Sequence, residues 1–379
     1  MAGFTGLTLH STITEEGQLL LSAEEVTAPP PGPGEIIVRV EAAPLNPSDI
    51  GLLLGPADLS TLRSIPGDKL PGAAALVPPS KLTSLASRLN RALPIGNEGA
   101  GSVMQAGEGA EHLLGRKVAF LANGGAYAQY RTVKATECLV LPGTVSIKEA
   151  AGAFVNPLTA LGMVETMRRE NHHAIVHTAA ASNLGQMLNR LCLADDVPLV
   201  NIVRNPTQAD LLRGQGARHV VDSSSADFQA SLVTALEETG ATLAFDAIGG
   251  GTMASVILAS MEQVLSRRLR QYSRYGSPVP KQVYIYGSLD TGPKIFEGQF
   301  GMAWNVGGWL MSWFYERIGV SEAARLRSRA IDHLTNIFAS HYSKEITLAE
   351  ALSPPVIQAY ARRATGEKYL LLPNEQLAC

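Results

Sequence analysis

The segment best suited to chemistry is a turn at His177–Gly185 (HTAAASNLG), which leaves an apolar strand and opens a helix. The first N–H groups of a helix and its dipole hold anions, and dinucleotide-binding proteins place their pyrophosphate there. Small residues allow a close approach of the backbone, and Ser182 or Asn183 can donate to phosphate. The turn therefore predicts cofactor contacts from a run of five residues: Ala181, Ser182, Asn183, Leu184 and Gly185.

The same turn permits a second interpretation. Most glycines of the G-x-G-x-x-G fingerprint are missing, and only Gly185 remains. An ordinary helix with Ser182 or Asn183 as its N-terminal cap would have the same residues. The turn alone leaves both interpretations open.

The end of the next strand favours NADPH over NADH. Arg204 and Asn205 follow Asn201-Ile202-Val203, where NADP sites often place an arginine near the 2′-phosphate. A guanidinium matches phosphate in charge and geometry. The alternative is a solvated arginine at a strand end, and Arg218 is a weaker second candidate for the phosphate.

Two further turns follow predicted strands. Ala247, Ile248 and Gly249 come after the fourth strand of this region, and Tyr286 and Gly287 lie at the end of the fifth. Open α/β sheets bind ligands at the carboxyl ends of their strands. Each turn alone could be a simple tight connection, but together they support a cofactor site.

These turns require a sheet that brings them to one edge. From about residue 150, strand and helix signals alternate, which predicts βαβ units and a parallel sheet. The fold class is therefore α/β, with a Rossmann doubly wound parallel sheet. The expected strands are 174–178, 198–203, 219–222, 242–246 and 282–286, and the expected helices are 184–193, 208–215, 226–238 and 252–264.

The N-terminal part is expected to be rich in β-structure. Residues 35–41, 116–121 and 126–133 read as short strands between Gly/Pro turns, which suggests a partly open barrel or a sandwich. Residues 55–94 read as an insertion or active-site loop with a short helix at 81–92. Near the C-terminus we expect a helix at 321–340 and a strand at 368–372.

Composition excludes several classes of protein. The 379 residues carry a net charge of −3 without a basic stripe, so nucleic acid and anionic membranes are not expected partners. Cys138, Cys192 and Cys379 are far apart, which argues against a disulfide framework and a cysteine-rich zinc site. No apolar run reaches the roughly 20 residues that span a bilayer. We therefore expect a cytoplasmic protein.

Several motifs, in order along nearly the whole chain, resemble the medium-chain dehydrogenase/reductase superfamily. Within it, the chain is most similar to the zinc-free branch of quinone oxidoreductases and enoyl reductases. The motifs are Ala43–Asp49 (APLNPSD), Gly96–Gly101 (GNEGAG), Gly125–Tyr130 (GAYAQY), Asn156–Ala160 (NPLTA), Ala179–Gly185, Phe245–Gly250 (FDAIGG) and the closing strand.

The resemblance implies a split architecture. A GroES-like catalytic domain would take residues 1–155, completed by residues 318–379, and a Rossmann NADP-binding domain would take residues 156–317. Residues 301–314 fall where such reductases often place an edge strand that forms a homodimer. Trp304, Trp309 and Trp313 would then either bury against a second subunit or fill the core of their own.

The resemblance also implies chemistry without a metal. Zinc-dependent members place Cys and His at positions that match Asn46 and Asn97, and carboxamides are poor zinc ligands. Enoyl-thioester reductases carry a tyrosine shortly after the NPSD motif, whereas Gly51–Ala57 has none. This difference argues against acyl-thioester reduction.

The function expected from these features is NADPH-dependent reduction of quinones or activated C=C bonds. Asn46 would contact substrate or nicotinamide, and Thr159 would lie on the nicotinamide side of the cofactor. Tyr127 would donate a hydrogen bond, or else be an aromatic core residue. The competing hypothesis is an NADPH-binding sensor or scaffold of the same fold without turnover.

Overall fold

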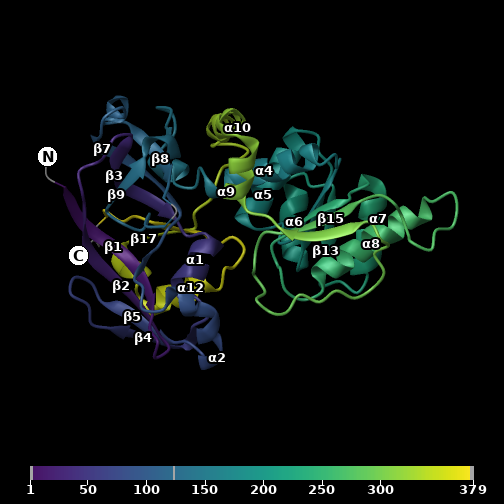
Figure 1. The fold of residues 1–379 in the computed structure, drawn as a ribbon, viewed down its shortest axis with the longest axis horizontal. Helices are drawn as coiled ribbons and strands as arrows, with labels where there is room; N and C mark the ends of the chain where they lie inside the picture. Colours follow the sequence, from purple (N-terminus) through teal and green to yellow (C-terminus); the bar gives the residue numbers. More distant parts are fainter. Residues whose placement is uncertain (1–2, 123, 376–379) are drawn as a thin grey trace. The chain divides into compact units, whose positions relative to one another are not determined.

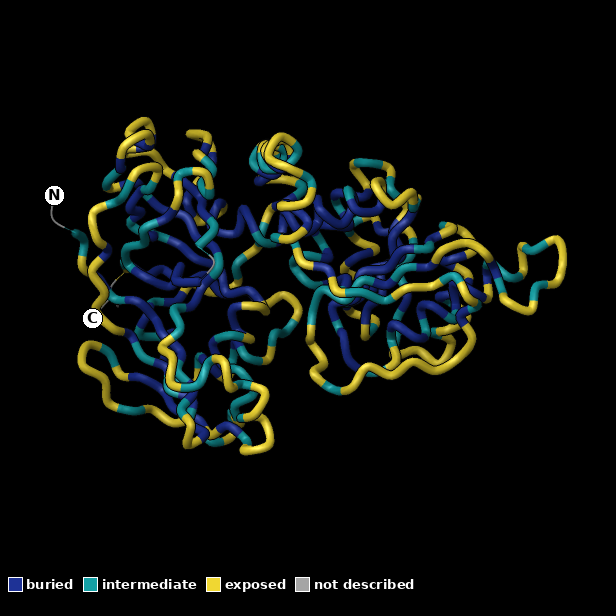
Figure 2. Tube along the Cα trace, in the orientation of Figure 1, coloured by how far each residue is buried: buried dark blue, intermediate teal, exposed yellow. Residues whose placement is uncertain are grey.

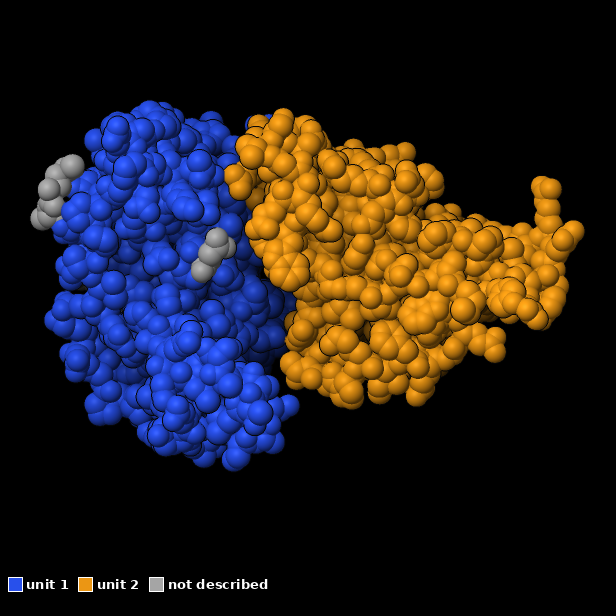
Figure 3. All heavy atoms as spheres, viewed as in Figure 1, with its two compact units in different colours: residues 1–155, 331–379 blue, residues 156–330 orange. Residues whose placement is uncertain are grey.

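The computed structural model describes residues 3–122 and 124–375 (Figure 1). The chain forms two compact units (Figure 3). Unit 1 contains residues 1–155 and 331–379, and unit 2 contains residues 156–330. The chain thus returns to unit 1 after residue 330, compared with residue 317 in the sequence-based expectation.

Unit 1 contains a seven-stranded sheet that joins both ends of the chain. Its order is β10-β8-β7-β3-β18-β17, and β9 also pairs with β3. Leu370 of β18 lies opposite Pro44 of β3 in antiparallel register, so the C-terminal segment completes the sheet. The strands are β3 (Glu35–Pro44), β7 (Glu98–Ala106), β8 (Lys117–Leu121), β9 (Tyr130–Lys134), β10 (Cys138–Val140), β17 (Lys344–Ile346) and β18 (Tyr369–Leu371).

A second sheet of unit 1 has five strands in the order β4-β5-β2-β1-β6. These are β1 (Phe4–Ile13), β2 (Gln18–Ala28), β4 (Asp58–Ile65), β5 (Gly72–Leu76) and β6 (Leu93–Pro94). The helices of unit 1 are α1 (Pro47–Leu54), α2 (Pro79–Leu82), α3 (Ile147–Ala150), α11 (Leu348–Ala351) and α12 (Pro354–Ala361).

The expectation of a loop at residues 55–94 is therefore wrong in part. β5 pairs with β2 and places Ala73, Ala74 and Ala75 in buried positions. Alanine is depleted in strands, so this alanine run gave a weak strand signal, and tertiary pairing decided its structure. The helix expected at 81–92 is reduced to the end of α2 and a 3₁₀ segment at Thr83–Arg88.

Unit 2 contains a six-stranded sheet of order β13-β12-β11-β14-β15-β16, and every neighbouring pair is parallel. All residues of β11, β12 and β14 are buried, as expected for strands covered on both faces. The doubly wound fold predicted from the alternating pattern is confirmed. Its strands are β11 (Ile175–His177), β12 (Leu199–Val203), β13 (His219–Asp222), β14 (Leu243–Asp246), β15 (Lys281–Ile285) and β16 (Trp304–Gly308).

The helices of unit 2 connect these strands. They are α4 (Val155–Arg169, which starts at the last residue of unit 1), α5 (Asn183–Ala194), α6 (Pro206–Gly214), α7 (Phe228–Thr239), α8 (Met253–Arg267), α9 (Met311–Ile318) and α10 (Val320–Asp332, which ends in unit 1). Figure 2 shows the buried positions of each unit gathered along its strands and the helix faces that cover them. The predicted helix at 321–340 ends earlier, at Asp332.

Two kinds of feature are absent from the described residues. No helix among them is long and apolar enough to cross a membrane, and no group of three or more His, Cys, Asp or Glu side chains among them could hold a metal ion. Cys138 and Cys192 are free thiols. Cys379 lies outside the described residues.

Candidate functional site

The predicted turn at His177–Gly185 connects β11 to α5 in unit 2. Ser182 is the N-cap of α5, and its Oγ accepts a hydrogen bond of 3.1 Å from the Gly185 N–H. A Cβ at Gly185 would lie 2.2 Å from the Ala180 carbonyl oxygen, so only glycine fits there. Ala179 adopts a φ of 51°, the left-handed region that usually favours glycine. The helix is thus capped by Ser182, while the hydroxyl hydrogen of that serine can still be donated.

The turn is fixed to the neighbouring strand. Thr178 donates a hydrogen bond of 2.8 Å from its hydroxyl to Asp246 Oδ1, and its Oγ1 accepts from the Ala247 N–H. The Asp246 carboxylate also accepts from the N–H groups of Ile248 and Gly249. Asp246 therefore organises two turns at the point where the strand order reverses, which is where this fold binds dinucleotides. Thr178 and Asp246 were not predicted as site residues, because nothing in the local sequence pattern shows this pairing.

Two glycines bring the other predicted turns together. Gly249 has a φ of 80°, and a Cβ there would lie 2.5 Å from the Gly287 carbonyl oxygen. A Cβ at Gly287 would lie 2.5 Å from the Ala247 carbonyl oxygen. The loops after β14 and β15 thus approach as closely as backbone allows. The structure brings the predicted residues Ala247, Ile248, Gly249, Tyr286 and Gly287 to one edge of the sheet.

Arg204 and Arg218 lie at opposite edges of this sheet. In the parallel register of β12 and β13, Val203 is level with Asp222 and Val200 with His219. Arg204 therefore follows the carboxyl end of β12, whereas Arg218 precedes the amino end of β13. The Arg204 side chain is exposed and has no ion-pair partner in the described chain. Asn205 caps α6, since its side-chain oxygen accepts from the Gln208 N–H at 2.9 Å.

Tyr286 pairs with a histidine at the same edge. The Nε2 atom of His177 lies 2.7 Å from the Tyr286 hydroxyl oxygen, and the two rings are stacked. Burial lowers the pKa of His177 to about 3, so its imidazole is neutral near pH 7. His172 bonds through Nδ1 to the Thr242 hydroxyl. These contacts give His172 and His177 structural roles. Thr159, predicted on the nicotinamide side, is buried in α4.

In unit 1, the predicted residue Asn46 is buried and engaged. It is the N-cap of α1 and forms a capping box with Asp49, whose Oδ2 accepts from the Asn46 N–H at 3.0 Å. Its side-chain Nδ2 donates to Glu98 Oε1 at 2.7 Å. The other oxygen of Glu98 accepts from the N–H groups of Phe154 and Val155 at 2.9 and 2.8 Å. These contacts give Asn46 a structural role within unit 1.

Asn46 belongs to a buried charged cluster that the sequence analysis did not find. It contains Asp49, Glu98 and Lys368. Burial raises the pKa of Asp49 to about 7 and also raises that of Glu98, while it lowers the pKa of Lys368 to about 8. The Lys368 Nζ atom is buried without a hydrogen-bond partner in the described chain and lies 5.5 Å from the centre of the Tyr342 ring. Asp49 and Glu98 lie in the APLNPSD and GNEGAG motifs, but the three residues come from distant parts of the sequence, so no local motif shows that they meet.

Two polar residues beside this cluster reach solvent. Ser48 is exposed and Asn97 is partly buried. Asn97 Nδ2 donates to Ser48 Oγ at 3.3 Å, and the Asn97 N–H donates to Asp49 Oδ1 at 3.0 Å. Asn97 was named from the sequence only as a position that matches a zinc ligand, and Ser48 lies in the NPSD motif two residues after Asn46, so the two motifs could have indicated both residues.

Tyr127 is almost completely buried, and its hydroxyl donates to the Pro44 carbonyl oxygen at 2.9 Å. This placement favours the alternative of an aromatic core residue.

The three tryptophans of unit 2 divide between core and surface. Trp309 is buried and donates to the Thr166 hydroxyl at 3.1 Å, whereas Trp304 and Trp313 are 37% and 62% exposed.

Comparisons with known proteins agree with this geometry. Residues 32–143 match the model of the alcohol dehydrogenase GroES-like domain. The synaptic vesicle membrane protein VAT-1 homolog of Rattus norvegicus is 27% identical over 237 residues, which cover 62% of this chain and 51% of that protein. The mitochondrial enoyl-[acyl-carrier-protein] reductase of Caenorhabditis elegans is 27% identical over 208 residues, covering 53% of this chain and 52% of that protein. The chain spans about half the length of these relatives.

A solved structure extends the similarity over nearly the whole chain. Escherichia coli quinone oxidoreductase, solved in complex with NADPH, superposes with a TM-score of 0.66 at 20% identity. The match covers 98% of this chain and all of the other. At this identity, the similarity demonstrates a shared fold.

Proposed function

We propose that this protein, which has the fold and the GroES-like domain of the zinc-free medium-chain dehydrogenase/reductases, is an NADPH-dependent oxidoreductase. Its substrates would be quinones or activated C=C bonds such as those of enones. The observation that carries the proposal is the edge of the unit 2 sheet where the Ala179–Gly185 turn, the Gly249 and Gly287 loops and Arg204 lie together.

The residues at this edge fit a dinucleotide. The first turn of α5 offers N–H groups and a positive dipole end to a pyrophosphate. Gly249 and Gly287 keep side-chain atoms away from the crossing of the two loops. Arg204 offers an unpaired guanidinium to a 2′-phosphate, and no carboxylate follows β12 to repel it. When bound, NADPH supplies the hydride.

Unit 2 offers polar groups to the cofactor, and unit 1 offers polar groups to the substrate. In unit 2, Asp246 fixes the cofactor turns, and the Tyr286 hydroxyl is available at their edge. In unit 1, Asn46 and Tyr127 are engaged in internal hydrogen bonds, so we assign the polar contact with substrate to Ser48 and Asn97. Their donor and acceptor groups would hold and polarise a carbonyl oxygen of the substrate.

The proposal is tested by binding and turnover. NADPH is titrated by fluorescence, and its oxidation is then followed with 1,2-naphthoquinone, an enone and a crotonyl thioester. We expect binding, and oxidation with the first two acceptors. Binding without oxidation by any acceptor would favour the alternative of a sensor or scaffold, and failure to bind NADPH would contradict both.

The cofactor preference has a separate test. Arg204→Ala should weaken NADPH binding about tenfold or more, since charge-assisted hydrogen bonds are worth about 1.5–3 kcal/mol. It should leave NADH binding nearly unchanged. Equal losses for the two cofactors would refute the phosphate role. A homodimer and a cytoplasmic location remain predictions from the sequence.

A further inference from the structure

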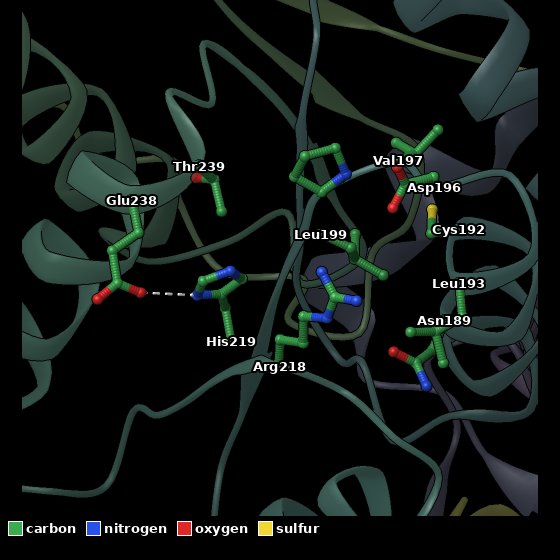
Figure 4. Close-up of a pocket in the computed structure, with 11 residues that line it drawn as sticks. Asn189, Cys192, Leu193, Asp196, Val197, Leu199, Arg218, His219, Glu238 and Thr239 are labelled. Carbon is green, nitrogen blue, oxygen red and sulfur yellow. Dashed lines mark ion pairs between the residues drawn. The ribbon is translucent and has the colours of Figure 1, made fainter.

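A cavity of about 220 Å³ lies at the amino-terminal edge of the unit 2 sheet, opposite the candidate cofactor site (Figure 4). The end of α5, the starts of β12 and β13 and the end of α7 form its walls. Pockets for drug-sized ligands measure about 300–1,000 Å³. The cavity therefore suits a smaller metabolite.

Two unpaired charges of opposite sign line the cavity. Arg218 and Asp196 are both exposed, and neither has an ion-pair partner among the residues that the structure describes. Figure 4 shows the Arg218 side chain extending between the His219–Glu238 pair and the residues at the end of α5. Glu238 is engaged by His219, whose Nδ1 lies 3.1 Å from its carboxylate. The lining thus offers one available cation and one available anion.

The placement of the charges indicates where each end of a ligand would bind. α5 and α7 both end at the cavity, and the carbonyl groups of a helix C-terminus carry partial negative charge. Asp196 follows the end of α5 and adds a full negative charge there. That side favours an ammonium group, while the Arg218 guanidinium suits a carboxylate with two parallel hydrogen bonds.

The remaining lining is mostly apolar, with one amide and the Thr239 hydroxyl, which donates to the Ala235 carbonyl oxygen at 2.7 Å. Leu193, Val197 and Leu199 provide aliphatic surface. Asn189 also lines the cavity, and it is 2% exposed. Its Oδ1 accepts from Asn201 at 3.3 Å, whereas its Nδ2 is buried without a partner in the described chain. Because this nitrogen atom is itself enclosed, it lies behind the cavity wall and takes no part in ligand contacts.

We propose that this cavity is a second binding site, for a zwitterionic α-amino acid with an aliphatic side chain. Arg218 binds the carboxylate, Asp196 binds the ammonium group, and Leu193, Val197 and Leu199 contact the side chain. A simple anion is disfavoured, because Asp196 and Glu238 both face the cavity. This site is separate from the proposed NADPH site, so each can fail without the other.

The test is calorimetric titration of the full chain with three molecules of one carbon skeleton. L-Leucine carries both charges, 4-methylpentanoate lacks the ammonium group, and 3-methylbutylamine lacks the carboxylate. We expect L-leucine to bind at least tenfold more tightly than either analogue. No L-leucine binding at millimolar concentrations, or equal binding of 4-methylpentanoate, would overturn the proposal.

Variants assign the two charges. Arg218→Gln and Asp196→Asn should each weaken L-leucine binding at least tenfold, and Arg218→Gln should remove the preference over 3-methylbutylamine. Arg213→Gln, an exposed arginine of α6 paired with Asp210, is the matched control and should have no effect. An equal loss in this control would overturn the assignment. All variants should keep the wild-type melting temperature and NADPH affinity, which excludes misfolding as the cause.

Discussion

The imidazole Nε2 of His177, at the end of β11, lies 2.7 Å from the hydroxyl oxygen of Tyr286, which follows β15. His177 Nδ1 is buried without a hydrogen-bond partner in the described chain. A buried N–H without an acceptor is costly, so the neutral ring carries its hydrogen on Nε2 and donates it to Tyr286. The Tyr286 hydroxyl hydrogen is then available to another acceptor at the cofactor edge.

Tyr286→Phe should weaken NADPH binding about fivefold, which corresponds to the loss of one neutral hydrogen bond of about 1 kcal/mol. Fluorescence titration measures the change. Tyr284→Phe is the matched control, because the Tyr284 hydroxyl donates to Glu170 instead. It should leave the NADPH affinity unchanged. Unaltered affinity in Tyr286→Phe would contradict a hydrogen bond from the Tyr286 hydroxyl to NADPH.

Because of Asp49, the free energy of unfolding should fall as pH rises from about 4 to about 7. Burial raises the pKa of its carboxyl from 3.8 to about 7, so the folded protein binds a proton over this range that the unfolded chain has released. The stabilisation is complete below the lower pKa and is lost as pH rises through the higher one. Lys368, with its pKa lowered from 10.5 to about 8, should act oppositely, so that stability rises with pH between those values.

The test of the Asp49 effect compares urea unfolding at about pH 5 and about pH 7. Asp49→Asn should show a smaller fall in unfolding free energy between these conditions than the wild type. Asp58→Asn is the control, because hydrogen bonds from Ser60 lower the pKa of the exposed Asp58 carboxyl and its titration lies below this range. An identical fall in Asp49→Asn and the wild type would rule out Asp49 as its source.

Gly249→Ala should destabilise the protein more than an ordinary left-handed glycine would. A Cβ in the left-handed region costs roughly 1–2 kcal/mol, and at Gly249 it would also lie 2.5 Å from the Gly287 carbonyl oxygen. Gly240→Ala is the matched control, with a φ of 66° and no atom within 4 Å of the added Cβ. Each kcal/mol lowers the melting temperature by roughly 2–4 °C in domains of this size. Equal melting temperatures in the two variants would show that the loops can separate without cost.

The fold of unit 2 could be predicted because short stretches of its sequence indicate each strand and helix. Strand β13 (His219–Asp222) has the predicted bounds, and α5 and β14 differ from the predicted ranges by a residue at one or both ends. The alternation of strand and helix then selects the parallel sheet. In unit 1, the strands β1 and β2 were not predicted, and the exposed half of β2 carries Glu24 and Glu25, which are unfavourable in strands.

The residues of the candidate site could be predicted from the sequence only where they lie in a turn that follows a strand. The residues after β11, β12, β14 and β15 meet at one edge because parallel strands end there together. Glu98 and Lys368 meet through the pairing of the C-terminal segment with β3, which no spacing along the chain reveals. The contact of Asn46 with substrate stays a prediction, and its hydrogen bond to Glu98 depends on the pairing of β3 with β7, which is also long-range.

Ser48 is the residue of unit 1 whose hydroxyl should matter most for turnover. Its Oγ accepts from Asn97 Nδ2, so its own hydrogen can be donated to a substrate oxygen. Asn97 is held in turn by its N–H bond to the buried Asp49 carboxylate. Ser48→Ala should therefore lower kcat for 1,2-naphthoquinone about tenfold to hundredfold, near or below the loss measured for donors of an oxyanion hole. NADPH affinity should not change, because this donor acts on the substrate.

Ser48→Thr separates this role from packing, since it retains the hydroxyl and should keep most of the activity. Ser60→Ala, which removes another exposed hydroxyl of unit 1, is the control and should have no effect. Stopped-flow measurement of NADPH oxidation distinguishes the chemical step from product release. If Ser48→Ala and Ser48→Thr lose activity equally, packing at α1 matters and the hydroxyl does not. If neither loses activity, the substrate oxygen takes its hydrogen bond from another group.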